Sequence, residues 1–282
     1  MPLSNRFAWV TLLCAALLAG GCAGLKPPAS NSQAVIEAWA ADNGYRAVTI
    51  PSSPYRLFSL LRQRRQSDEL VIYIEGDGTG RPSPFRPFEP TPRTPHALRM
   101  ADRDASPMVA YLARPCEYLS DANLPSCDSQ HWVTERYSAD VLDAMAAGVD
   151  DLKRRSGAAR LRLVGYAGGG VVATMLAVNR DDVSAVITVA SPLALAQWLA
   201  RNRLGWINPA LDPFEQRSLA GQMPTVHFVG GRDDIVSPEF PVNYVHKLGG
   251  TLIYIEDFDH ECCWANDWPW LLEQAHGEQS AP

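Results

Sequence analysis

Residues 161–177, LRLVGYAGGGVVATMLA, indicate the fold of this chain more strongly than any other stretch. The apolar run 161–165 has the length and composition of a buried strand, and an apolar helix is expected from Gly168 onward. Between them lies a tight, glycine-flanked turn. This order of strand, turn and helix is the layout of a nucleophile elbow, which presents one side chain at the edge of a sheet.

The elbow departs from its usual pattern at the central position. The pattern is Gly-x-Ser-x-Gly, whereas the chain reads Gly165-Tyr166-Ala167-Gly168-Gly169. A methyl group therefore stands where a nucleophilic hydroxyl is expected. A glycine-rich phosphate loop is the alternative interpretation, but no lysine follows the glycines and no Gly-x-Gly-x-x-Gly spacing is present.

Strand and helix patterns alternate on both sides of the elbow, which predicts an α/β fold with a mostly parallel central sheet and helices on both faces. We expect one domain over residues 34–282. The proline-rich stretch 81–95 is long enough to be a functional loop. Residues 193–223 fit no sheet element and form either a small cap or ordinary helical packing. Further strands are expected at 45–50, 55–61, 69–75, 108–112, 183–189, 225–229 and 251–255, and helices at 35–41, 139–155, 241–248 and 268–275.

Composition narrows the class of protein. The 282 residues are 46% apolar, enough for a large single core, and the net charge of −6 is scattered. No basic patch or interleaved aromatic pattern suggests a nucleic-acid partner. Nothing in the sequence indicates a cofactor or a metal.

The first 22 residues have the pattern of an export signal. Arg6 precedes an apolar stretch too short for a membrane span, and small residues lead to Cys22. This resembles a bacterial lipobox, in which the cysteine is acylated, although Ala19 stands where leucine is usual. We expect a lipid anchor on the periplasmic face of a bacterial membrane, followed by a flexible tether over 23–33. A conventional signal, leaving a soluble periplasmic or secreted protein, is the alternative.

Four further cysteines bear on the redox state. Cys116 and Cys127 bracket a short loop, and in an oxidising compartment we expect them to form a disulfide. Cys262 and Cys263 are then either a vicinal disulfide or two free thiols. Zinc is disfavoured, because no CxxC pair or suitably spaced histidine accompanies them.

Candidate site residues follow the strands in a characteristic order. Gly76 and Asp77 come directly after the strand at 69–75, where their backbone amides are suited to binding an oxyanion, and Gly168 at the helix start is a further donor. Asp233 follows the strand at 225–229 and is the candidate acid, with Asp234 as its alternative. The last strand is followed by His260, a candidate general base.

On these residues the chain, from about Tyr45 to its C-terminus, resembles the α/β-hydrolase superfamily, and more narrowly a group of uncharacterised bacterial lipoproteins of that fold. The resemblance implies hydrolysis of an ester, thioester or amide through a serine nucleophile, without specifying a substrate. It rests on the following motifs: Ile74-Glu75-Gly76-Asp77-Gly78, Ala113-Arg114-Pro115-Cys116, Val164-Gly165-Tyr166, Gly168-Gly169-Gly170, Val229-Gly230-Gly231-Arg232-Asp233 and Asp259-His260-Glu261-Cys262-Cys263-Trp264.

Family members of this kind carry serine at the position of Ala167, so triad catalysis is expected to be lost in this sequence. Three explanations stay open. The substitution was introduced to trap a substrate, or the protein is a natural pseudoenzyme that binds an acyl ligand, or the nucleophile has moved. Candidates for a relocated nucleophile are Ser191, Tyr166, Cys262 and Cys263.

Overall fold

The computed structural model describes residues 32–78, 90–119 and 127–279. Eight strands form a single sheet in the order β1-β2-β4-β3-β5-β6-β7-β8. β1 pairs with β2 and β2 with β4 in antiparallel fashion, whereas the other neighbours are parallel. The predicted mostly parallel sheet is therefore confirmed. The strands are β1 (Arg46–Ser52), β2 (Tyr55–Gln63), β3 (Glu69–Ile74), β4 (Met108–Leu112), β5 (Arg160–Tyr166), β6 (Val183–Val189), β7 (Thr225–Gly230) and β8 (Thr251–Ile255).

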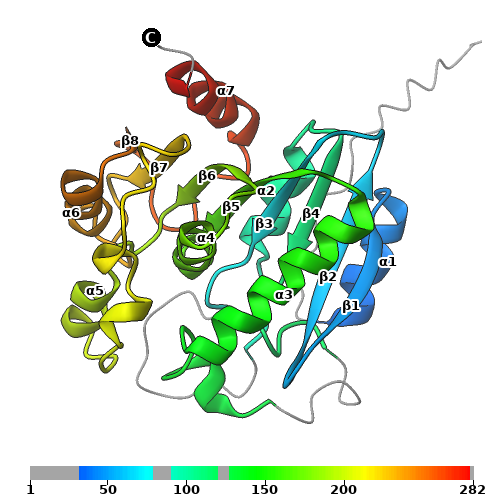
Figure 1. Cartoon of the computed structure of the whole chain (residues 1–282), viewed down its shortest axis with the longest axis horizontal. Helices are drawn as coiled ribbons and strands as arrows, with labels where there is room; N and C mark the ends of the chain where they lie inside the picture. The colour runs from blue at the N-terminus through cyan, green and yellow to red at the C-terminus, as the bar shows by residue number, and fades with distance from the viewer. Residues whose placement is uncertain (1–31, 79–89, 120–126, 280–282) are drawn as a thin grey trace, which may run out of the picture.

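Helices cover both faces of this sheet (Figure 1). The apolar core is accordingly divided into two clusters, one on each face. In Figure 1, α3 crosses in front of the strands. One cluster holds side chains of α1 (Gln33–Asp42), α2 (His96–Arg103) and α7 (Trp268–Gln279), and the other those of α3 (Ala139–Ser156), α4 (Gly168–Val178), α5 (Leu195–Arg201) and α6 (Glu239–Leu248).

Central strands are buried on both faces, which explains their continuous apolar sequences. Every residue of β4 and of β7 is buried, as expected for strands of a sheet covered by helices. By contrast α3 has an apolar stripe, an N-cap at Ser138 and a left-handed Gly157 at its C-cap. Because these signals are local, the strands and α3 could be predicted from the sequence.

Helix α2 is an element that sequence patterning missed. It has eight residues and follows directly on Pro95, so its periodic signal is short. Ala97, Leu98, Met100 and Ala101 pack against the sheet within the α1–α2–α7 cluster. Its residues favour a helix, but eight residues are too few to form a stable helix alone, so burial against the sheet stabilises it.

The segment 193–223 contains α5 and two short 3₁₀ turns. Leu195, Trp198 and Leu199 join the core cluster of α3 and α4, and Trp198 Nε1 donates to the Ile235 carbonyl at 2.8 Å. These are contacts of a helix packed on the core. A separate cap over the strand ends stays a prediction.

Candidate active site

The elbow is formed where β5 ends at Tyr166 and α4 begins at Gly168. Between them Ala167 has φ 48° and ψ −121°, a conformation that L-residues rarely adopt. A Cβ at Gly165 would collide with the Gly169 carbonyl, so the strand and helix approach each other too closely for any side chain there. The positive φ of Ala167 is a strain that costs roughly 1–3 kcal/mol in a residue other than glycine. The backbone therefore has the strained geometry of a nucleophile elbow, with Ala167 at its central position.

Replacing Ala167 with glycine is expected to stabilise the fold by about 1 kcal/mol. Relief of the positive-φ strain exceeds the added chain entropy of glycine in the unfolded state. Urea unfolding measures the change. Ala173→Gly, in the right-handed interior of α4, is the matched control and should destabilise by about 1 kcal/mol or more. Equal destabilisation by both changes would show that Ala167 is unstrained.

Asp233 and His260 form a buried pair at the carboxyl ends of β7 and β8. Asp233 Oδ2 lies 2.9 Å from His260 Nδ1, and both side chains are almost fully buried. Asp233 Oδ1 accepts the amides of Ile235 and Val236, at 2.9 and 2.7 Å, which fixes the orientation of the carboxylate. Neighbouring Asp234 is exposed. Of the two candidate acids, the structure brings Asp233 to the histidine.

The loop that carries His260 is attached to the elbow. Tyr166 Oη donates to the His260 carbonyl at 2.9 Å, and the two rings lie 5.4 Å apart between centroids. Trp264 Nε1 donates to the same carbonyl at 3.0 Å. Because Tyr166 is the residue before Ala167, these contacts place the Asp233–His260 pair next to the nucleophile position.

The oxyanion turn, which we define as residues 76–78, lies against the elbow. A Cβ built on Gly76 would be 3.3 Å from the Ala167 Cβ. The Gly76 amide donates to the Glu75 side chain at 3.0 Å, so this amide is already engaged and is not a free oxyanion donor. Neither the Asp77 amide nor the Gly168 amide donates to another described residue. These two amides are the remaining candidate oxyanion donors.

The side chain of Asp77 crosses over the start of α4. A Cβ at Gly168 would overlap the Asp77 carboxylate, which therefore lies at the positive end of the helix. Tyr137 Oη donates to Asp77 Oδ2 at 2.6 Å, and Arg114 Nη1 donates to Oδ1 at 3.1 Å. Arg136 is a further cation, 3.9 Å away. Arg114 and Arg136 offset the charge of a carboxylate that would otherwise repel a developing oxyanion, and the Tyr137 hydroxyl holds it in place.

Solved structures match this arrangement over most of its length. XC6422 from Xanthomonas campestris, described as a serine hydrolase of α/β type without a lid, is 15% identical with a TM-score of 0.58, over 84% of this chain and 97% of that one. Est1E from Butyrivibrio proteoclasticus is 15% identical with a TM-score of 0.56, over 82% and 99%. The chain has an α/β-hydrolase fold.

A further neighbour of this hydrolase fold carries an alanine substitution. A serine-to-alanine mutant of puromycin hydrolase, complexed with PGG, is 15% identical with a TM-score of 0.57, over 83% of this chain and 39% of that one. No family model matches the chain, and no curated protein matches its sequence. At these identities the likeness establishes the fold alone.

His96 is a site residue that sequence reasoning missed. It begins α2, and its ring stacks on Tyr166 with centroids 4.7 Å apart. Burial, with the nearby charges of His260 and Arg99, lowers the pKa of His96 to about 4, so the ring is neutral at pH 7. Histidines outside the last loop carried no sequence signal of their own.

Each candidate for a relocated nucleophile has another structural role. Ser191 Oγ donates to the Val189 carbonyl at 3.0 Å and is buried. Tyr166 donates to His260, and burial raises its pKa well above the usual value. Cys262 and Cys263 form a vicinal disulfide, the first of the two states that the sequence left open. In this hydrolase fold none of the four is a ready replacement for the serine.

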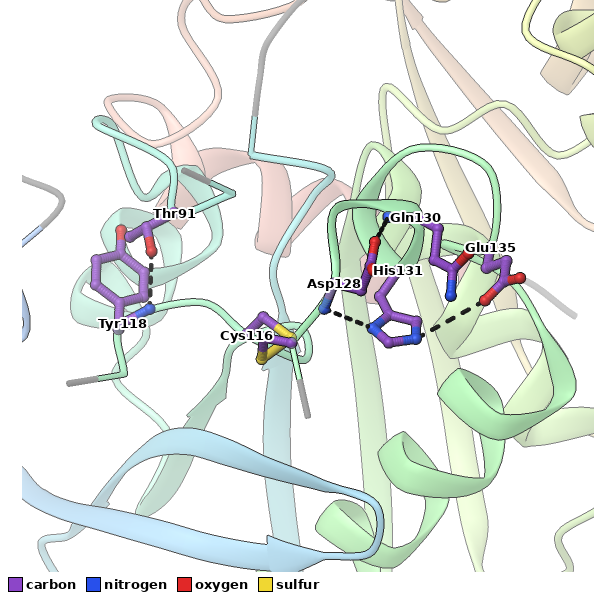
Figure 2. The surroundings of a disulfide bond; sticks show 8 residues. Thr91, Cys116, Tyr118, Asp128, Gln130, His131 and Glu135 are labelled. Atoms are coloured by element: carbon purple, nitrogen blue, oxygen red, sulfur yellow. Dashed lines mark hydrogen bonds and ion pairs between the residues drawn. A yellow bond between two sulfur atoms is a disulfide. The ribbon is translucent and has the colours of Figure 1, made fainter. Parts of the chain in front are cut away.

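The predicted disulfide between Cys116 and Cys127 is present, with Cα atoms 5.7 Å apart (Figure 2). It joins the segment after β4, which holds Arg114, to the turn before α3, which holds Tyr137. The disulfide therefore links the two segments that supply the partners of Asp77.

Hydrogen bonds on either side of this disulfide order the same two segments, as Figure 2 shows. The Tyr118 amide donates to Thr91 Oγ1 at 2.9 Å. On the other side, the Asp128 amide donates to His131 Nδ1 at 3.2 Å, and His131 Nε2 lies 3.8 Å from Glu135 Oε2. These contacts hold the backbone in place on both sides of the Cys116–Cys127 disulfide.

Some of the features predicted from sequence fall outside the described residues. The export signal, Cys22 and most of the tether precede residue 32, and much of the loop at 81–95 lies in the stretch 79–89. Within residues 32–78, 90–119 and 127–279, no helix is long and apolar enough to span a membrane.

Proposed function

We propose that this chain is an exported, lipid-anchored protein that binds an acyl-bearing ligand in the site of a serine acyl-hydrolase, and that it does not turn that ligand over. The observation that carries the proposal is the buried Asp233–His260 pair beside a strained elbow that holds Ala167. A pair with this geometry serves to orient a base toward a nucleophile, and strained backbone of this kind clusters at functional sites.

In a serine hydrolase of this layout, the serine oxygen attacks the carbonyl carbon and its proton passes to the histidine. The tetrahedral oxyanion is bound by backbone amides. At this site the amides of Asp77 and Gly168 would bind the ligand carbonyl, and His260 would lie beside the acyl carbon. Ala167 has no oxygen with which to form the acyl-enzyme, so ligand binding is retained and the covalent step is lost.

A ligand complex of the serine-to-alanine mutant of puromycin hydrolase supports this proposal by analogy of fold. Lipid attachment at Cys22 belongs to the proposal as well, and would hold the site at the periplasmic face of a membrane. The alternative is a conventional export signal, which would leave the same binding protein soluble in the periplasm or secreted.

The test of the proposal is labelling by a fluorophosphonate probe, which reports an activated serine nucleophile. The chain as it stands is expected to remain unlabelled, while p-nitrophenyl butyrate raises its melting temperature by mass action without release of nitrophenol. Free p-nitrophenol, which lacks the acyl group, is the control ligand and should have no effect. Labelling that needs His260 would reveal a substitute nucleophile and refute the binding-only function, and an ester without effect on melting would refute ligand capture.

A further inference from the structure

The carboxylate of Glu75 lies behind the oxyanion turn and contacts two separate elements of the site. Glu75 directly follows β3 and is 1% exposed. Its Oε1 accepts the Gly76 amide at 3.0 Å and the Ala97 amide at 3.3 Å. One oxygen atom thus joins the oxyanion turn to the first turn of α2.

Each of these two amides is next in sequence to a group that faces the site. The peptide after Gly76 supplies the Asp77 amide, one of the two candidate oxyanion donors. Ala97 is the second residue of α2, and the first is His96, whose ring stacks on Tyr166 beside Ala167. We call the His96 ring stacked on Tyr166 the His96 wall of the site. A shift of Glu75 Oε1 would therefore move an oxyanion donor and this wall together.

Burial makes this acceptor hard to replace. Glu75 is enclosed by the sheet and α2, where the Tyr111 hydroxyl and the Leu98 amide also interact with its carboxylate. Burial raises the pKa of Glu75 to about 7. A proton on Oε2 leaves Oε1 free to accept both amides, so the link persists in either protonation state. The isosteric amide of glutamine would preserve it too.

We propose that Glu75 is a positioning residue that sets the oxyanion turn and the His96 wall of the site in register through its Oε1 acceptor. What this positioning is for rests on the proposed function. The positioning itself can be measured whether or not that function is correct.

Two variants of similar size separate the acceptor from its packing volume. Glu75→Gln keeps an oxygen acceptor, and Glu75→Met fills the same space without one. In the full chain, hydrogen exchange over residues 74–78 is expected to be about tenfold faster or more in Glu75→Met and unchanged in Glu75→Gln. The NMR resonances of the His96 ring, shifted by stacking on Tyr166, should move only in Glu75→Met.

Asp104→Asn is the matched control, because Asp104 is another buried carboxylate but bonds Tyr73 Oη and the Ser106 amide, both at 2.7 Å. Its removal should leave the exchange over 74–78 and the His96 resonances unchanged. The proposal is overturned if Glu75→Met matches the parent, or if Glu75→Gln changes both readouts as much as Glu75→Met does.

A second measurement tests whether the positioning by Glu75 affects the reactivity of a serine at residue 167. In an Ala167→Ser background, Glu75→Met should slow fluorophosphonate labelling by about 100-fold, whereas Glu75→Gln should leave the rate near that of Ala167→Ser alone. If Ala167→Ser alone is never labelled, the proposed function fails, yet exchange and the His96 resonances still decide the role of Glu75. Equal labelling rates for the Met and Gln variants would overturn the proposal.

Discussion

The Ala167→Ser variant is expected to be labelled by fluorophosphonate and to hydrolyse short-chain p-nitrophenyl esters at least ~10³-fold faster than the parent. Loss of the serine costs a serine hydrolase about six orders of magnitude in kcat, so the gain on restoring it is large even when recovery is partial. The elbow backbone already holds residue 167 at φ 48°, and Asp233 already orients His260. One oxygen atom is the missing part.

Ala167→Ser is best compared with a serine placed elsewhere on the same helix. Ala173→Ser adds the same hydroxyl to a buried interior position of α4 and should remain unlabelled. The double variant Ala167→Ser/His260→Ala should lose the restored activity, because no base then accepts the serine proton. An Ala167→Ser variant that neither reacts with fluorophosphonate nor cleaves any short-chain ester would contradict the hydrolase site.

In the Ala167→Ser background, Asp233→Asn is expected to lower kcat by about 10⁴-fold with little change in the fold. The asparagine oxygen can still accept the amides of Ile235 and Val236, but its NH₂ group faces His260 Nδ1 and favours the wrong tautomer of the ring. Nε2 then carries the proton and cannot act as the base.

Steady-state kinetics with p-nitrophenyl butyrate measure this loss, and circular dichroism checks the fold. Asp234→Asn is the matched control, since Asp234 is the adjacent exposed carboxylate. It should change kcat by less than about twofold, because exposed substitutions of this kind have small effects. A large loss from Asp234→Asn with little loss from Asp233→Asn would mean that the acid has been misassigned.

The strands, the elbow and the long helix α3 were predictable because their signals are local. An apolar run, a glycine-flanked turn or an N-cap serine is complete within one short stretch of chain. Helix α2 escaped prediction because its eight residues span little more than two turns, too few for a clear periodic signal. Ser191 could be weighed as a nucleophile until its hydroxyl was found bonded to the Val189 carbonyl.

For the site, sequence order indicated which strands carry Gly76, Asp77, Asp233 and His260, but not what their side chains contact. The spacing after the strand favoured Asp233 over Asp234, but only the folded chain shows which carboxylate is buried against the histidine, since one step in a turn reverses which carboxylate is buried. Nor could it foresee that the Gly76 amide binds Glu75. Such contacts depend on how separate loops meet at the sheet edge.

The order of residues and their local periodicity were sufficient to predict the alternation of strands and helices and the strand-turn-helix elbow around Ala167. They could not predict that Tyr137, Arg114 and Arg136 hold the Asp77 carboxylate, or that Glu75 joins the oxyanion turn to α2. Each of those contacts joins segments that meet only in the folded chain. They exist only after the sheet has brought the carboxyl ends of its strands to one edge, where burial removes water and makes each hydrogen bond specific.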